Sequence, residues 1–227
     1  MTILEGLTAV RAKIVVACES CGRDPSTVSL LPVSKRHPPA AILQAKATGL
    51  SLFGENRVQE LVEKSEVLGD AGVEWHFVGS LQSNKVSSLL RVPSLVLVQS
   101  LDRIKLADAL QLGLADAGRE LSVLIQVNAT GEESKHGATP AGAAELLRHV
   151  VDNCPQLRPA GVMAMGPLHG DPQPVFQRVA SLHEDLRQHV GLPLPTRSMG
   201  MTDDMTAAIG AGSTMVRVGT GIFGPRP

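Results

Sequence analysis

The chain has 227 residues, a formal net charge of −1, and 2% aromatic residues with four Phe, one Trp and no Tyr. A balanced charge gives no electrostatic basis for binding nucleic acid or an anionic membrane, and so few aromatic rings disfavour platforms for base stacking. The core must therefore consist of Leu, Val, Ile, Ala and Met, and a chain of this length can form a substantial one.

The first residues and the cysteines indicate a cytoplasmic protein. Residues 1–5 have neither the basic start nor the apolar segment of a signal peptide, and no apolar run is long enough to span a bilayer. Three cysteines are an odd number, which disfavours a disulfide framework. Cys18 and Cys21 form a C-x-x-C, but they end a predicted helix and no second pair follows at zinc spacing. We interpret both as packing residues, and because no histidine pair has ligand spacing we predict no metal site.

Helical and strand-like segments alternate along the whole chain. A helix is predicted over residues 4–21. The predicted strands are 28–34, 50–53, 74–78, 95–99, 121–128, 158–165, 196–199 and 214–218. The predicted helices between them are 39–47, 58–68, 83–90, 102–117, 140–153, 172–190 and 203–209. Asp102 and Asp203 stand where N-caps of two of these helices are expected.

The strand pattern predicts the fold class. Several strands are near-continuous apolar runs, such as 95–98 and 123–127, which is typical of a parallel sheet covered on both faces. Eight strands alternating with helices predict a (β/α)₈ TIM barrel with an extra N-terminal helix. A doubly wound sheet is the alternative, because strand counts from one sequence can err by one or two. No segment has the composition of a linker, so we expect one domain over residues 1–227.

Lys35 is the most informative single residue. It ends the apolar run 28–34 and precedes Arg36, His37 and two prolines, a pattern typical of a buried strand that ends in a loop. Beside a partly desolvated cleft, burial and nearby cations disfavour the charged form of an amine. Such an amine can attack a carbonyl carbon and form a Schiff base, which is how pyridoxal phosphate (PLP) is held. The alternative is a solvated lysine just past a strand.

Two glycine clusters follow the last two predicted strands. In Ser198-x-Gly200 and Gly219-Thr220-Gly221, a hydroxyl stands beside glycines whose backbone N–H groups can approach an anion closely. A phosphate site after strands seven and eight is a recurring feature of the barrel. Each cluster alone fits an ordinary turn better than a phosphate site, but both together, opposite Lys35, predict a phosphate site.

Other polar residues at the strand ends leave alternatives open. Arg217, on the last strand, would pair with phosphate, face a heteroaromatic nitrogen, or form a surface ion pair. His76 fits a hydrogen-bonded core histidine as well as a catalytic one. Glu55 and Asn56 open a helix, so capping competes with ligand contact. Lys135 would bring positive charge to the cleft or belong to the loop surface.

Long motifs in this chain resemble the YggS/PROSC group of pyridoxal-phosphate homeostasis proteins, single-domain relatives of the alanine racemase barrel. They span almost the whole chain. The matching segments are VSK at 33–35 with Pro38, FGENRVQE at 53–60, WHFVGSLQSNK at 75–85, KHG at 135–137, GVMAM at 161–165, SMGMTDD at 198–204 and AIGAGSTMVRVGTGIFG at 208–224.

This resemblance implies a fold, a vitamin B6 cofactor and a set of site residues. The fold is the alanine racemase N-terminal domain, the type III fold of PLP proteins. The resemblance implies that Lys35 holds PLP as a Schiff base, that Arg217 faces the pyridine nitrogen, and that Lys135 offers a secondary contact. Phosphate would be held by Ser198, Gly200, Gly219 and Thr220. Asn56 and Met165 would line the ring pocket.

Two functions fit this resemblance. The first is a cytoplasmic, monomeric PLP carrier or buffer, without an established reaction, whose partners are PLP and PLP-dependent apoenzymes. The second is a small PLP-dependent amino-acid racemase that uses Lys35 as its base. Larger racemases use a tyrosine from a second domain as the opposite base, and this chain has no tyrosine. The carrier is therefore favoured, with no role for nucleic acid or membrane.

Overall fold

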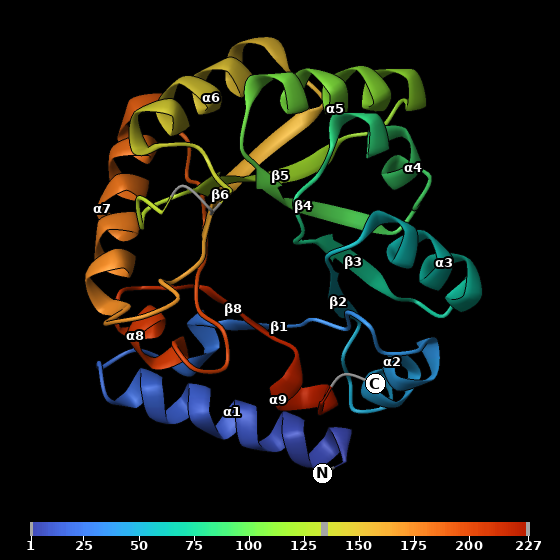
Figure 1. The fold of residues 1–227 in the computed structure, drawn as a ribbon, viewed down its shortest axis with the longest axis vertical. Helices are drawn as coiled ribbons and strands as arrows, with labels where there is room; N and C mark the ends of the chain where they lie inside the picture. Colours follow the sequence, from blue (N-terminus) through green and yellow to red (C-terminus); the bar gives the residue numbers. More distant parts are fainter. Residues whose placement is uncertain (1, 133–135, 226–227) are drawn as a thin grey trace.

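The computed structural model describes residues 2–132 and 136–225. In this part of the chain eight parallel strands form a nearly closed barrel with helices on its outside (Figure 1). The strands are β1 (Ser29–Pro32), β2 (Leu52–Glu55), β3 (Glu74–Phe77), β4 (Leu95–Leu101), β5 (Leu121–Val127), β6 (Leu157–Ala164), β7 (Thr196–Ser198) and β8 (Met215–Val218). The prediction of a (β/α)₈ barrel is thereby confirmed, and the doubly wound alternative is wrong.

The strands follow one another around the barrel in chain order, and β1 pairs with β8 to join the two ends of the sequence. The remaining seam lies between β1 and β2. There the strands meet through a single parallel bridge between Val33 and Gly54, and the amide of Ser34 donates to the carbonyl of Gly54 at 2.9 Å. This seam lies directly before Lys35 in the chain.

Helices alternate with the strands and cover the outside of the barrel. The longer ones are α1 (Ile3–Glu19), α2 (Pro39–Lys46), α3 (Val58–Leu68), α5 (Ile104–Ala117), α6 (Pro140–Asn153) and α7 (Gln173–Val190). The shorter elements are η1 (Pro25–Thr27), η2 (Ser83–Lys85), α4 (Val86–Leu90), α8 (Met205–Gly210) and α9 (Thr220–Phe223). None of the described helices has both the length and the apolar character needed to cross a membrane.

The extra N-terminal helix is present, and a capping box begins it. The Thr2 side chain accepts from the Glu5 amide, and the Glu5 carboxylate accepts from the Thr2 amide, so two unpaired helix N–H groups are satisfied. The buried face of α1 packs on α8, β8 and α9 through Leu7, Val10 and Ile14. In Figure 1 this helix runs alongside β1 and β8, so it supports the side of the barrel that carries the chain ends.

Two predicted helix caps are wrong. Helix α5 begins at Ile104 with Arg103 as its N-cap, because the carboxylate of Asp102 accepts from the Arg103 guanidinium at 2.5 Å instead of from the helix. Helix α8 begins at Met205, and its N-cap is Asp204 rather than the predicted Asp203. The Asp204 carboxylate accepts from the Met201 amide at 2.5 Å and so holds the loop before α8.

Candidate functional site

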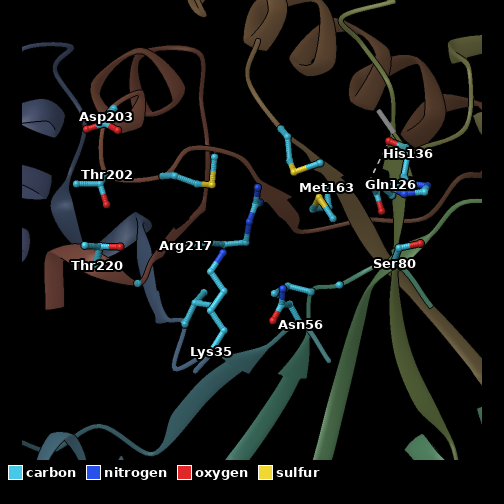
Figure 2. A pocket seen from close by; sticks show the side chains of 16 residues that line it. Lys35, Asn56, Ser80, Gln126, His136, Met163, Thr202, Asp203, Arg217 and Thr220 are labelled. Atoms are coloured by element: carbon cyan, nitrogen blue, oxygen red, sulfur yellow. Dashed lines mark hydrogen bonds between the residues drawn. The ribbon is translucent and has the colours of Figure 1, made fainter. Parts of the chain in front are cut away.

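A cavity of about 420 Å³ opens at the carboxyl ends of the strands (Figure 2). Its walls come from segments that follow most of the strands, as expected for a barrel of this class. The lining residues are Val33, Lys35, Asn56, Val78, Gly79, Ser80, Gln126, His136, Met163, Met165, Met201, Thr202, Asp203, Arg217, Gly219 and Thr220. The volume lies in the range of small-molecule sites.

The structure brings most of the predicted site residues together in this cavity. Those that line it are Lys35, Asn56, Met165, Arg217, Gly219 and Thr220. In Figure 2 the Lys35 side chain points into the cavity toward Arg217. Thr202 and Thr220 lie on one side of these two cations, and Asn56 and Ser80 lie on the other. The arrangement combines an amine, a buried cation and hydroxyls in one enclosed space.

Ser198 and Gly200 lie behind the cavity wall rather than on it. The Ser198 side chain is fully buried, donates to the Gln99 side chain at 2.7 Å and accepts from Arg217 at 2.7 Å. Gly200 adopts φ 92°, and an added Cβ would lie 2.6 Å from the Ala208 side chain, so packing against α8 requires glycine there. The Gly200 carbonyl accepts from the Arg217 amide. Both residues therefore hold Arg217 in place by accepting hydrogen bonds from it.

Arg217 is the buried cation of the site, not a surface ion-pair partner. It is 6% exposed, and its guanidinium donates to the carbonyl and hydroxyl of Ser198 and to the Ala164 carbonyl, at 2.6, 2.7 and 2.9 Å. Burial lowers the pKa of Arg217 to about 10, so the guanidinium remains charged at neutral pH. It can donate hydrogen bonds to a ligand but cannot accept them.

A neutral hydrogen-bond network extends from Arg217 across the barrel interior. Gln99 accepts from Ser198 and donates to His76 Nδ1 at 2.9 Å. Because an amide NH₂ group only donates, His76 Nδ1 is the acceptor. Burial lowers the pKa of His76 to about 4, so the ring is neutral at pH 7. His76 is thus a hydrogen-bonded core residue, and it lies outside the cavity lining.

Lys35 occupies the second position of a turn at the end of the β1 segment. The Ser34 carbonyl accepts from the His37 amide at 3.0 Å, and Arg36 has a φ of 65°. A positive φ at the third position is the mark of a type II turn, which normally places glycine there. Lys35 is half-buried, and the turn directs its side chain to the cavity (Figure 2).

Several lining residues were not among the predicted ligands. Thr202 carries a hydroxyl to the same side as Thr220, and the Lys13 amine of α1 donates to its carbonyl at 2.5 Å. Ser80 and Gln126 follow or end strands and present polar groups from the opposite side. Their position at or just after the carboxyl ends of strands was the available signal. Choosing among many such residues needs the three-dimensional arrangement.

Two other predicted contacts have different outcomes. Lys135 falls outside the residues that the structure describes. Glu55 is fully buried and is absent from the cavity lining, so it is not placed to contact a ligand there. The N-cap of α3 is Arg57, so Glu55 does not cap that helix either.

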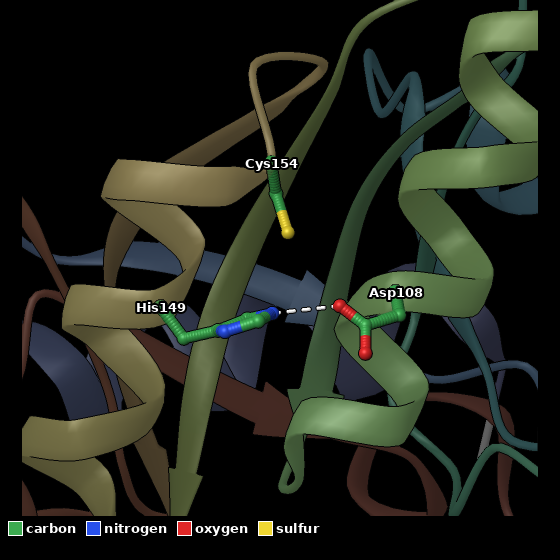
Figure 3. Close-up of side chains that lie close together, drawn as sticks. All are labelled: Asp108, His149 and Cys154. Atoms are coloured by element: carbon green, nitrogen blue, oxygen red, sulfur yellow. Dashed lines mark hydrogen bonds and ion pairs between the residues drawn. The ribbon is translucent and has the colours of Figure 1, made fainter.

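Within the described chain, one group of potential metal ligands lies away from the cavity, between α5 and the end of α6 (Figure 3). It consists of Asp108, His149 and the buried Cys154. His149 Nε2 and Asp108 Oδ1 are 2.6 Å apart, the distance of a direct hydrogen bond. Two atoms bound to one tetrahedral zinc ion would be about 3.3 Å apart. The observed pair is therefore a hydrogen bond between neighbouring helices.

Comparison with known proteins places this chain in a class and then in a family. The model of the family "Alanine racemase, N-terminal domain" matches residues 7–227. The chain is 40% identical over 229 residues to the pyridoxal phosphate homeostasis protein of Aquifex aeolicus, covering 100% of this chain and 99% of that protein. It is 43% identical over 232 residues to the protein of the same name from Haemophilus influenzae, covering 100% and 97%.

Solved structures agree with this placement. PipY of Synechococcus elongatus, solved with PLP bound, has a TM-score of 0.85 and 32% identity, covering 98% of this chain and 100% of PipY. D-threonine aldolase from Filomicrobium marinum has a TM-score of 0.75 at 18% identity, covering 97% of this chain and 59% of the aldolase, and shares the fold. The chain belongs to the pyridoxal phosphate homeostasis proteins, a family built on the alanine racemase N-terminal domain.

Proposed function

We propose that this protein binds PLP as a Schiff base on Lys35 and acts in PLP homeostasis as a carrier or buffer. The observation that carries the proposal is the meeting of Lys35, Arg217 and the Gly219–Thr220 segment in one cavity. Residues 35 and 220 are far apart in the sequence, and only the closed barrel brings them together. Relatives support it through their shared name, and PipY supports it because its structure was solved with PLP.

The residues of the cavity fit the chemistry of PLP. Bound PLP supplies an aldehyde and an electron-withdrawing ring. The Lys35 amine is the nucleophile that would hold the aldehyde carbon, with one water molecule as the leaving product. Asn56 and Met165 line the space for the ring. A donor set of one amine, one guanidinium and several hydroxyls suits an anionic aldehyde of this kind.

The phosphate is proposed to bind on the side of Thr220. An added Cβ at Gly219 would lie 3.1 Å from the Val33 carbonyl, so glycine permits the close approach of these two segments. Hydroxyls of Thr220 and Thr202 are on this side, and hydroxyl donors are suitable partners for phosphate oxygens. Ser198 and Gly200 contribute indirectly, through their bonds to Arg217.

Arg217 favours holding the cofactor over deep carbanion chemistry. Facing the pyridine nitrogen, a guanidinium that remains charged at neutral pH would donate a hydrogen bond and leave that nitrogen unprotonated. An unprotonated ring is a weaker electron sink. A racemase also needs an acid or base on the opposite face, and the chain contains no tyrosine to supply the usual group.

The cellular setting belongs to the same proposal. Cys18, Cys21 and Cys154 are free thiols, which is consistent with the reducing cytoplasm. We propose one PLP-binding domain over residues 1–227 that acts there as a monomer and delivers PLP to PLP-dependent apoenzymes.

The decisive experiment adds PLP to the purified protein and records the absorption spectrum. Borohydride reduction and peptide mapping follow. We expect a Schiff-base band and a pyridoxyl adduct on Lys35, and we expect Lys35→Ala to lose both while keeping its circular dichroism spectrum. A wild-type protein without band or adduct would overturn the proposal. Exchange of an amino acid's α-proton in D₂O that is lost in Lys35→Ala would favour the racemase.

A further inference from the structure

A buried cluster of charges lies beside Lys35 but outside the cavity lining. It consists of Glu55 at the end of β2 and Glu60 and Lys64 on α3. The Lys64 amine is 2.5 Å from Glu55 Oε1, 2.7 Å from Glu60 Oε1 and 2.8 Å from the Ser34 carbonyl. These three acceptors match its three N–H donors. The Lys64 and Glu55 side chains are 5% and 0% exposed.

The cluster contacts both chain neighbours of Lys35. On one side, the Ser34 hydroxyl donates to Glu55 Oε1 at 2.6 Å, and the Ser34 carbonyl accepts from Lys64. On the other side, the Arg36 amide donates to Glu60 Oε1 at 2.5 Å. Lys35 is therefore flanked by two residues that are bonded to one rigid charged group.

The bond to Arg36 acts on an unfavourable backbone conformation. Arg36 has a φ of 65°, and residues with a Cβ rarely adopt this region because Cβ approaches the following carbonyl. A backbone in such a state persists when its surroundings hold it there. Glu60 accepts the Arg36 amide hydrogen in this turn, so it stabilises the conformation that presents Lys35 to the cavity.

From these contacts we infer that Glu55, Glu60 and Lys64 are positioning residues that hold the Ser34–His37 turn and so aim the Lys35 amine for reaction with an aldehyde. This inference rests on the proposed function of Lys35. Glu60 acts through the Arg36 amide, and Glu55 and Lys64 act through Ser34. Glu60 is the best residue to test, because its side chain is 18% exposed and its removal leaves the more buried Lys64–Glu55 pair in place.

The test compares Glu60→Ala with Glu60→Gln in the full chain. Alanine removes the acceptor for the Arg36 amide, whereas glutamine keeps a carbonyl oxygen at that place. Stopped-flow absorbance would follow formation of the Schiff-base band after mixing with PLP. Since a hydrogen bond to a charged group is lost, we expect a rate roughly tenfold lower in Glu60→Ala. We expect Glu60→Gln within about threefold of wild type, because a neutral acceptor replaces a charged one.

The matched control is Glu66→Ala on the same helix. Glu66 is exposed and pairs only loosely with Arg91, at 3.5 Å, so we expect the wild-type rate. A Glu60→Ala rate equal to that of Glu66→Ala would overturn the inference. Equal slowing by Glu60→Ala and Glu60→Gln would also overturn it, because the effect would then follow charge rather than the hydrogen bond that holds the turn.

Two further readouts separate positioning from general damage to the fold. A 4′-deoxy analogue of PLP, which lacks the aldehyde, should bind Glu60→Ala and wild type with the same affinity. In cofactor-free protein, the Arg36 amide should exchange its hydrogen faster in Glu60→Ala than in Glu60→Gln. A parallel loss of analogue affinity, or unchanged exchange, would contradict the inference.

The outcomes also separate this inference from the proposed function. If the wild-type protein forms no adduct on Lys35, the proposed function fails, and the exchange rate of the Arg36 amide still reports whether Glu60 holds the turn. If the wild type forms the adduct and Glu60→Ala does so equally fast, the proposed function stands and the positioning role of Glu60 fails.

Discussion

The two sides of the cavity are held in different ways. On the Lys35 side, a buried cluster of three charged residues binds the turn after β1. On the Arg217 side, the guanidinium donates to uncharged oxygens, and a neutral chain of Ser198, Gln99 and His76 continues the network. The Lys35 side thus depends on a cluster of opposite charges, and the Arg217 side holds one buried cation with uncharged acceptors.

This contrast has a physical consequence for how each side fails. A buried ion pair loses most when one partner is removed, because the other charge is left without compensation. A neutral network loses the energy of individual hydrogen bonds, which is smaller. It is also insensitive to pH until one of its members titrates. The comparison can therefore be tested by removing a charge, by changing the pH and by removing one hydroxyl.

The largest effect should come from Lys64→Met. This change leaves Glu55 buried beside an apolar side chain, and burial already raises the pKa of that carboxyl in spite of the opposing influence of Lys64. Removing one partner of a buried pair costs about 3–5 kcal/mol, so we expect the free energy of unfolding to fall by that order. Denaturant titration measures it.

Lys105→Met is the matched control, because Lys105 is exposed on α5. We expect this variant to change the free energy of unfolding by less than about 0.5 kcal/mol. Equal losses of unfolding free energy in the two variants would show that the buried Lys64 stabilises the fold no more than an exposed lysine does.

A smaller effect is expected from pH on the Arg217 side. The pKa of His76 is about 4 in the folded protein and 6.5 as its ordinary value. Between these pH values the unfolded chain binds the proton and the folded one does not, so acid favours unfolding. Stability should thus be fully present above pH 6.5 and decline as pH falls toward 4, by up to about 3 kcal/mol from this residue.

His76→Gln should reduce this decline. Denaturant titrations between pH 4 and pH 7 would compare its slope with that of wild type. Burial also lowers the pKa of His183, so the variant should keep part of the slope. An unchanged slope in His76→Gln would show that His76 is not kept neutral by the fold.

The smallest effect is expected from Thr220→Val. Loss of one hydroxyl donor to a phosphate should cost about 1 kcal/mol, which is roughly a fivefold weaker retention of PLP. Dialysis followed by absorbance measures the PLP that remains. Thr206→Val on α8 is the control, because Thr206 is exposed and outside the cavity lining. Equal retention in the two variants would remove Thr220 from the phosphate site.

The sequence predicted the barrel well because apolar residues recur with a different period in strands than in helices. Each of the eight predicted strands overlaps an observed one, and α3 has the predicted bounds, Val58–Leu68. Helix starts were harder to predict. An aspartate near a helix start serves as a cap only if nothing else binds its carboxylate, and Arg103 binds that of Asp102.

The site was predicted less completely, for reasons that involve distance along the chain. Lys64 follows Glu60 at the spacing of a surface ion pair on a helix. It is buried because Glu55, at the end of β2, lies against it, and this contact is not visible in the local sequence. Ser198 stands beside a glycine at a strand end, which is equally suited to phosphate and to Arg217. Its hydrogen bond to Gln99 of β4 crosses the barrel interior, and no local pattern signals such a contact.

The pairing of β1 with β8 has a consequence for synthesis of the protein. Residues 29–32 are made long before their partners at 215–218. The β1–β8 junction cannot form before residues 215–218 have been made, and the apolar face of α1 packs on residues of the same late segment. The barrel is therefore completed only after residues 215–218 have been made. A nascent chain therefore carries Lys35 without the opposite side of the cavity until residues 215–220 have been made.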